Sequence, residues 1–411
     1  MRFLSFVSFR TLAFLLFTLT MIPDFSWSDG VFFTIRIEAP ATVGYSADQR
    51  AVIVFDQERK TETLVLSTKY HGTWLDFAWV IPVPQLPSRE QVDLLPDGNN
   101  AFREIVSFTE PRAETEIVVT GCVSPGCGYG GAPSGAPAAP SLEVIDRFKV
   151  KGMDIALLQA QDANELMEWL NANGYRVPQN ASETLAHYIA RQWKFVAVKV
   201  DTDDEETAQR MEVSSYFPYE PLVLTFHTDE CVFPMKISAL SSRPEESNIL
   251  VFVFSNHRMC AINYPTVEVS PPKINSLSDF RPAYEQAFRS AMETEKGRAF
   301  VVEYAGLVNP DQFSPSLKNF LRQNGSADRW FLTRLRTLFR PSDMKDDVFL
   351  TADESDKPVS IIVRPYSSQQ ARAIRFLLPI ALSICWFFFR RSSKRAWKEA
   401  LLVGLISSLA I

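Results

Sequence analysis

Short apolar runs separated by polar loops dominate the first part of the chain. The runs are rich in Val, Ile, Phe and Thr and have the length of β-strands; they cover residues 31–38, 50–56, 61–70 and 76–84. The polar residues 57–60 separate the second run from the third, as a hairpin loop does. The pattern predicts an antiparallel meander of the first three strands, in which residues 50–56, apolar on both faces, are central.

The fourth run, DFAWVIPVP, is apolar from Phe77 to Ile81 and then contains Pro82 and Pro84. Proline has no backbone N–H and is therefore found at the edges of sheets. Because the two prolines alternate, both missing donors face the same edge. We expect the end of this strand to leave its sheet as a rigid, open edge that can accept a partner strand or peptide.

Helical patterns alternate with further strands in the longer second part. Strand-like runs cover residues 143–151, 193–200, 221–228, 231–240, 249–256 and 331–340. Four helices are expected from their caps and apolar stripes: they run from Asp162 to Gly174, from near Ser182, through Tyr284, Phe288 and Ala291 to Gly297, and from Ser314 and Pro315 to Gly325. The sequence therefore predicts an α+β fold, mainly antiparallel β-sheet and sandwich-like, with several packed helices and a C-terminal transmembrane helix.

A segment of Gly, Ala and Pro, residues 121–141, contains almost nothing to bury and is expected to form a linker loop. It separates a strand-rich N-terminal part, residues 29–120, from an α+β second part of the same domain, residues 142–350.

The N-terminal residues have the pattern of a secretory signal peptide. Two arginines flank the start, residues 11–22 form a short apolar core, and Ser26 and Ser28 place small residues before a cut at Asp29. We expect residues 1–28 to be removed and the body to lie outside the cytoplasm.

The C-terminal end is expected to anchor the protein in a membrane. Residues 374–390 contain an uncharged run that ends in three phenylalanines, after a juxtamembrane segment at residues 351–373. A basic cluster and an apolar tail occupy residues 391–411, and the basic cluster places that side in the cytoplasm.

The membrane is thus an expected partner. Nucleic acid is not, because the net charge is −6 and no basic run precedes this end.

The cysteines offer two disulfides or one metal site. If residues 231–240 and 249–256 form a hairpin, Cys231 lies almost opposite Cys260, within reach of a disulfide. His227 and His257 precede these cysteines and make a less favoured zinc set with them. Cys122 and Cys127 are predicted to close a small loop by a second disulfide. No cofactor is expected.

No catalytic motif is present: the sequence contains no G-x-S-x-G elbow, no P-loop, no G-x-G-x-x-G and no HExxH. An envelope hydrolase that uses dispersed side chains is an alternative. It requires two or more of Asp76, Glu303, His71 and His227 to converge in one pocket.

Several segments in order resemble one bacterial family. YSADQRAVIVFD, ETLVLSTKYHG, DFAWVIPVP and FTEP, followed by WLNANGYRVP, PLVLTFHTDECVFPMKIS and FLTRLRTLFRPSDMKDDVF, are similar to the domain-of-unknown-function family DUF2330. The signature residues of that resemblance are Asp76, Trp79, Pro82 and Pro84, with structural roles. A Cys-Gly pair that often follows the signal peptide in similar proteins is replaced here by SDGVFF.

The resemblance implies an exported, membrane-anchored envelope protein and no assigned activity. Together with the absence of a catalytic set, it favours a non-enzymatic module that binds an envelope protein, a peptide or a glycan.

Overall fold

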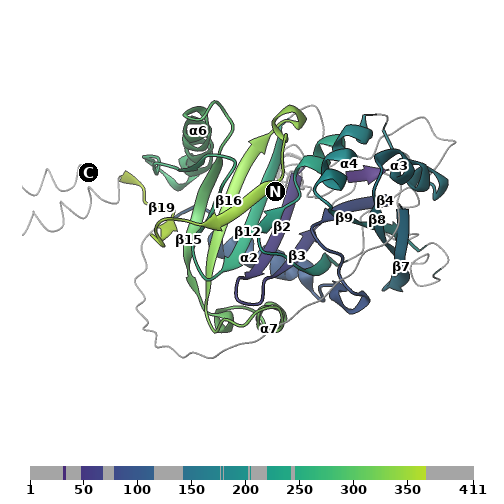
Figure 1. The fold of residues 1–411 in the computed structure, drawn as a ribbon. Helices are drawn as coiled ribbons and strands as arrows, with labels where there is room; N and C mark the ends of the chain where they lie inside the picture. Colours follow the sequence, from purple (N-terminus) through teal and green to yellow (C-terminus); the bar gives the residue numbers. More distant parts are fainter. Residues whose placement is uncertain are drawn as a thin grey trace, which may run out of the picture.

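The structure is a computed structural model with an α+β fold dominated by β-sheet (Figure 1). It describes residues 31–33, 48–67, 78–114, 142–175, 177–178, 180–201, 204, 220–241 and 246–366. Two large sheets face each other in the centre, and helices cover their outer faces.

The smaller of the two large sheets has five strands, each antiparallel to its neighbours. In spatial order these are β1 (Val31–Phe33), β4 (Ala78–Val83), β9 (Lys194–Val200), β8 (Met153–Ala160) and β7 (Leu142–Val150). Helices α3 (Ala163–Ala172) and α4 (Ala181–Ala190) cover its outer face, where their leucines pack against Leu158, Phe195 and Ala197.

The larger sheet has nine strands and mixes segments from distant parts of the chain. Its spatial order is β14 (Thr266–Glu268), β15 (Phe300–Val308), β16 (Trp330–Phe339), β12 (Ser247–Ser255), β2 (Asp48–Asp56), β3 (Thr61–Ser67), β10 (Leu222–His227) and β5 (Val92–Leu94), and β18 (Val359–Ser360) pairs with β15. The β12–β2 and β14–β15 pairs are parallel, and the other pairs are antiparallel.

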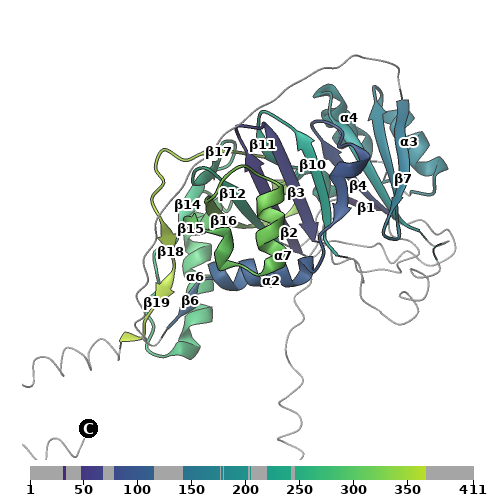
Figure 2. The same ribbon diagram turned by 90° about the horizontal axis from the view of Figure 1, so that it is seen from below.

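The two large sheets pack face to face around a shared apolar core. Alternate residues of β2 and β3, such as Ile53 and Leu64, join Trp79, Ile155 and Val198 of the smaller sheet in this core. Since alternate residues of a strand point to opposite faces, the remaining residues face outward and require a second layer. The result is a β-sandwich with helices on both sides (Figure 2).

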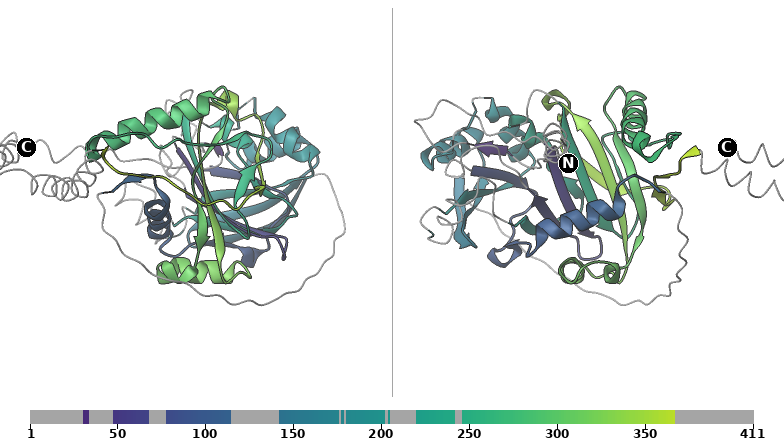
Figure 3. Two further views of the ribbon diagram at one scale, coloured as in Figure 1. Left: turned by 90° about the vertical axis from the view of Figure 1, so that its left-hand side faces the viewer. Right: turned by 180° about the vertical axis from the view of Figure 1, so that it is seen from behind.

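Three helices provide the outer layer of the larger sheet: α2 (Gly98–Thr109), α6 (Phe280–Glu293) and α7 (Pro315–Gln323). The left view of Figure 3 shows them in front of that sheet. Phe102 and Ile105 of α2 and Phe320 of α7 pack on Val54 and Phe252 of the sheet.

Two small sheets and several 3-10 turns complete the described fold. The small sheets are β11 (Cys231–Phe233), β17 (Val348–Ala352) and β13 (Met259–Ala261), with β17 in the middle, and the parallel pair β19 (Ile362–Val363) and β6 (Arg112–Ala113). The 3-10 turns are η2 (Arg89–Gln91), η3 (Lys236–Leu240), η4 (Leu277–Asp279), η5 (Pro310–Gln312) and η6 (Pro341–Asp343).

The cap signals in the sequence locate the helices correctly. The Asp162 side chain accepts hydrogen bonds from the backbone N–H groups of Asn164 and Glu165 at the start of α3. Gly174 adopts a φ of +87° just past the end of α3, where the left-handed conformation suits glycine. Ser314 and Pro315 begin α7 as expected. Helix α2 and several strands, among them β8, β15 and β17, were not anticipated.

Two predicted strand pairings are wrong. Strands β2 and β3 form the expected hairpin and β2 is central, but β1 lies in the other sheet beside β4, so the three-stranded meander does not form. The segment 231–240 is not one strand, because β11 ends before Pro234 and η3 follows. Both edges of β12 are occupied by β2 and β16, which leaves no edge for the predicted hairpin.

The two prolines of DFAWVIPVP lie differently from expectation. Pro82 is inside β4, opposite Phe195 of β9, and the buried run continues to Val83. A proline fits this ladder only if its nitrogen faces away from β9, toward the edge beyond the three residues of β1. The expectation that the strand leaves its sheet at Pro82 is therefore wrong. The expectation that the missing N–H of Pro82 faces an edge of the sheet agrees with this pairing. Trp79 is buried in the core between the sheets, and Asp76 lies outside the described residues.

The predicted signal peptide, linker loop and transmembrane helix also lie outside the described residues. Within the part of the chain that the structure describes, no helix is long and apolar enough to cross a membrane.

Candidate functional site

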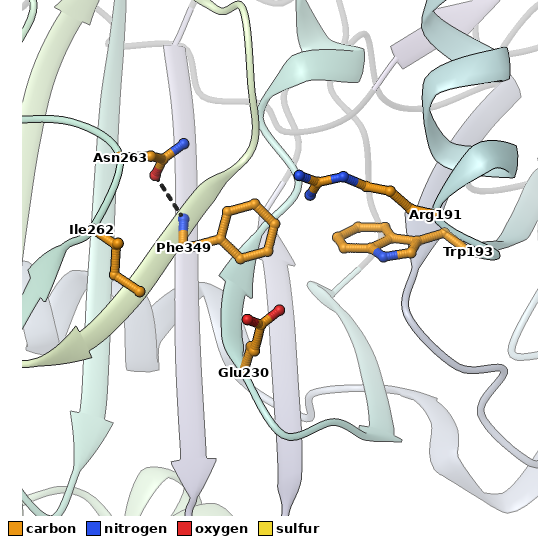
Figure 4. Close-up of a pocket in the computed structure, with 6 residues that line it drawn as sticks. All are labelled: Arg191, Trp193, Glu230, Ile262, Asn263 and Phe349. Carbon is orange, nitrogen blue, oxygen red and sulfur yellow. Dashed lines mark hydrogen bonds between the residues drawn. The ribbon is translucent and has the colours of Figure 1, made fainter.

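A cleft of about 390 Å³ opens where α4 and the small sheet β11–β17–β13 meet (Figure 4). Its lining residues are Arg191, Trp193, Glu230, Ile262, Asn263 and Phe349. They come from the end of α4, the β10–β11 turn, the segment after β13, and β17. Clefts of this size are typical of ligand sites.

The turn that ends α4 places Arg191 and Trp193 in the cleft. The backbone N–H of Trp193 donates to the carbonyl of Tyr188 and that of Gln192 donates to the carbonyl of Ile189, which is the Schellman arrangement. Gln192 has a φ of +61° at the position that usually carries glycine. This turn therefore fixes Arg191 and Trp193, at a local cost in backbone strain.

Arg191 and Phe349 form a cation–π pair in the cleft. The guanidinium carbon lies 4.9 Å from the centre of the Phe349 ring. The Asn263 side chain holds the backbone of this strand: its Oδ1 accepts from Phe349 N at 3.2 Å and its Nδ2 donates to Asp347 O at 2.7 Å. The amide of Asn263 is thus used for structure, and the Arg191 guanidinium is the polar group presented to a ligand.

Glu230 supplies a negative charge from the other side. Its carboxylate points into the cleft between Phe349 and Trp193 in Figure 4. The Thr228 hydroxyl fixes the turn, because it donates to Glu230 O at 2.8 Å and accepts from Glu230 N at 3.1 Å. In the part of the chain that the structure describes, neither Arg191 nor Glu230 forms an ion pair.

An apolar surface lies beside these charges. Ile262 is 63% exposed. Its backbone N–H donates to Phe349 O at 2.8 Å, so its place next to the ring is fixed by β17. The cleft therefore combines an apolar side chain, a cation and an anion.

A buried carboxyl group, Asp347, lies directly before the start of β17. Its Oδ1 accepts from the Tyr188 hydroxyl at 2.6 Å and from Lys236 N at 3.0 Å. Its Oδ2 is buried without a hydrogen-bond partner among the described residues. Burial raises the pKa of Asp347 to about 6, although these donors and the positive charges of Arg191 and Lys236 oppose the rise. Asp347 has no exposed surface and cannot touch a ligand in the cleft.

The predicted disulfide between Cys231 and Cys260 is not formed, and both thiols are free. Strand β17 lies between the strands that carry them, so their Cα atoms are separated by two strand spacings, roughly 10 Å. A disulfide needs Cα atoms within about 7 Å. Cys122 and Cys127 lie outside the described residues.

The predicted zinc set does not assemble. Among the described residues, no group of three or more His, Cys, Asp or Glu side chains is arranged to hold a metal ion. His257 Nδ1 lies 2.9 Å from Asp356 Oδ2, and His227 is exposed at the end of β10. Burial, and then the nearby carboxyl of Glu62, raise the pKa of Cys231 well above its usual value, which opposes the thiolate form that binds zinc.

Glu303 is part of a buried ion network and not of a pocket. Its Oε2 accepts from Arg334 Nε at 2.6 Å and its Oε1 accepts from the Tyr284 hydroxyl and from Arg336. Burial alone would raise the pKa of Glu303, but the two arginines hold it below its usual value. Five strand spacings, roughly 24 Å, separate β15 from the strand of His227, so these two residues do not converge. His71 and Asp76 lie outside the described residues.

No motif in the sequence predicted the cleft. Its residues come from four separate segments, and none belongs to a recognisable motif. The one local signal is the turn RQW, which follows an amphipathic helix and has no glycine at the position where the helix ends.

Comparison with known proteins gives a family and no activity. No curated protein and no solved structure matches the chain. A family model described as "Uncharacterized protein conserved in bacteria (DUF2330)" matches residues 39–351, which include every residue that lines the cleft. The chain therefore belongs to the DUF2330 family of bacterial proteins.

Proposed function

We propose that this protein is a non-enzymatic binding module of the bacterial cell envelope and that the cleft at Arg191, Glu230 and Ile262 is its binding site. The observation that carries this proposal is a cleft that combines an exposed isoleucine, on one side of the Phe349 ring, with two opposite charges on the other side that form no ion pair to a described residue. Apolar contact with Ile262 and charge-assisted hydrogen bonds to Arg191 and Glu230 would give a ligand both affinity and a fixed orientation.

The envelope location is supported by the sequence. Residues 1–28 have the pattern of a signal peptide, and residues 374–390 followed by a basic cluster have that of an anchor. In this arrangement the sandwich faces an extracytoplasmic partner, and the anchor keeps it at the membrane.

The hydrolase alternative has less support. Of its four candidate residues, the two that the structure describes are far apart in the larger sheet. The buried carboxyl nearest the cleft, Asp347, is covered and bonded to Tyr188. The cleft thus offers groups that recognise a ligand, and no described pair of groups that would transfer a proton to it.

The purified full-length protein tests the proposal against a panel of envelope-derived peptides and glycan fragments. We expect Ile262→Asp to abolish the binding that the wild type shows. Leu307→Asp is the matched control, because Leu307 is also 63% exposed but lies on β15, away from the cleft. Binding that survives Ile262→Asp would place the site elsewhere, and turnover of any substrate in a broad hydrolase panel would contradict the non-enzymatic assignment.

A further inference from the structure

The contact of Arg191 with Phe349 favours one kind of anionic group in a ligand. The guanidinium carbon lies 4.9 Å from the ring centre, a distance at which the aromatic face attracts the cation and so holds the side chain in the cleft. The planar fork of guanidinium N–H donors matches the two oxygens of a carboxylate, and a preordered arginine loses less entropy on binding. Arg191 is therefore suited to a carboxylate.

Glu230 specifies a cation at a different point of the cleft. Its turn is held by Thr228 and by the ion pair of the neighbouring Asp229 with Lys60, at 2.6 Å. Because the positive and negative groups of the cleft are fixed on different elements, a ligand must present its own charges in one order. The site thus distinguishes the two directions of an asymmetric ligand.

The apolar part of the cleft favours a peptide over a sugar. Arg191 lies over Phe349, and Trp193 is only 7% exposed, so neither ring presents the broad free face on which a sugar ring stacks. The exposed apolar group is instead the aliphatic Ile262. An aliphatic contact fits an apolar amino-acid side chain, and the volume of about 390 Å³ accommodates a few residues of an extended chain.

We infer that the ligand is a polypeptide segment of a partner protein that seats an apolar side chain on Ile262 and, beyond the Phe349 ring, presents an acidic residue to Arg191 and a basic residue to Glu230. This inference rests on the cleft being the binding site proposed above. Since both charges are on the surface, binding weakens as salt increases, because the screening length falls from about 10 Å at 0.1 M salt to about 3 Å at 1 M.

Fluorescence anisotropy with labelled 12-residue peptides tests the inference on the full-length protein. The probes carry a central leucine with a glutamate and a lysine on one side of it, in one order or in the reverse order, or with two glutamines in their place. We expect the wild type to bind one charged order at least tenfold more tightly than the other two peptides, because a charge-assisted hydrogen bond contributes about one to two orders of magnitude to binding. The double variant Arg191→Glu with Glu230→Arg should prefer the reverse order.

An exchange of preference cannot arise from a loss of folding. The matched control is Arg289→Glu with Glu246→Arg, which exchanges an exposed ion pair on the other side of the sandwich and should keep the wild-type preference. If the double variant does not fold, the single variants Arg191→Gln and Glu230→Gln should each reduce the preference to threefold or less.

The possible outcomes separate this inference from the proposed function. Peptides bound without preference for charge order, or a double variant that keeps the wild-type preference, overturn the peptide inference. Glycan or cell-wall fragments that bind in an Ile262-dependent way, while the peptides do not, overturn it as well but leave the binding module intact. Binding of any probe that is insensitive to Ile262→Asp overturns both.

Discussion

The buried carboxyl of Asp347 predicts a dependence of stability on pH that one substitution should remove. Burial raises its pKa from 3.8 to about 6 in the folded protein. A group whose pKa is raised by folding binds its proton more tightly in the folded state. Its contribution to stability is therefore fully present below about pH 3.8 and is lost as the pH rises through about 6.

The size of this effect follows from the two pKa values. Between pH 4.5 and 7.5, linkage predicts that the contribution of Asp347 to the free energy of unfolding falls by about 2 kcal/mol. The full change of its pKa on folding is equivalent to about 3 kcal/mol. The side chain is completely buried, so solvent does not screen the effect. The Asp347→Asn variant keeps an acceptor for the Tyr188 hydroxyl but does not titrate.

Urea unfolding of wild type and Asp347→Asn, followed by circular dichroism at pH 4.5, 5.5, 6.5 and 7.5, measures the difference in their free energies of unfolding. Titration of the other groups is common to both proteins and cancels. As the pH rises from 4.5 to 7.5, we expect the free energy of unfolding of the variant to increase by about 2 kcal/mol relative to that of the wild type. Tyr188→Phe removes a donor that lowers the pKa of Asp347, so it should move the change in stability to higher pH.

A difference between the two proteins that stays constant with pH would refute the reasoning, as would one that changes in the opposite direction. Either result would mean that water reaches Asp347 or that the ionised carboxylate has partners beyond Tyr188 and Lys236.

Three further predictions concern stability and are measured by the same unfolding assay at neutral pH. Glu303→Gln leaves the buried Arg334 without a carboxylate, although Arg336 keeps that of Glu285, and should cost about 3–5 kcal/mol. Glu246→Gln breaks an exposed pair and should cost at most about 1 kcal/mol; equal costs would show that burial does not matter here. Gln192→Gly should stabilise by about 1 kcal/mol, because glycine adopts a φ of +61° without strain, and a loss of stability would indicate that the Gln192 side chain has an unrecognised role. Gly325→Ala should destabilise by roughly 1–3 kcal/mol, because the added methyl carbon would lie 2.2 Å from the ring of the buried Trp330; a variant as stable as the wild type would mean that the ring can move.

Local signals in the sequence were reliable where neighbouring residues decide the outcome. The Asp162 cap, Gly174 and the Ser314–Pro315 start of α7 act within one helical turn, and each was predicted. The β2–β3 hairpin was likewise predicted, because four residues connect its strands.

Pairings between distant segments were predicted poorly. The parallel register of β12 with β2 joins residues about 200 positions apart, such as Phe252 and Val52. No local pattern encodes such a pairing, since any apolar strand edge can accept any other. The hairpin assigned to Cys231 and Cys260 failed for this reason, although Pro234 was a local sign that β11 stops early.

The sequence by itself determined the family, the α+β class dominated by β-sheet, and the ends of several helices, because apolar periodicity and caps act over a few residues. Only the tertiary structure decided which strands are neighbours, that Glu303 is neutralised by two arginines, and that Cys231 and Cys260 are too far apart to form a disulfide. It alone brought Arg191, Glu230 and Ile262 to one cleft. These strand pairings, ion pairs and cleft contacts depend on how two apolar sheet faces and their helices pack. That packing is a property of the whole chain and of no single segment.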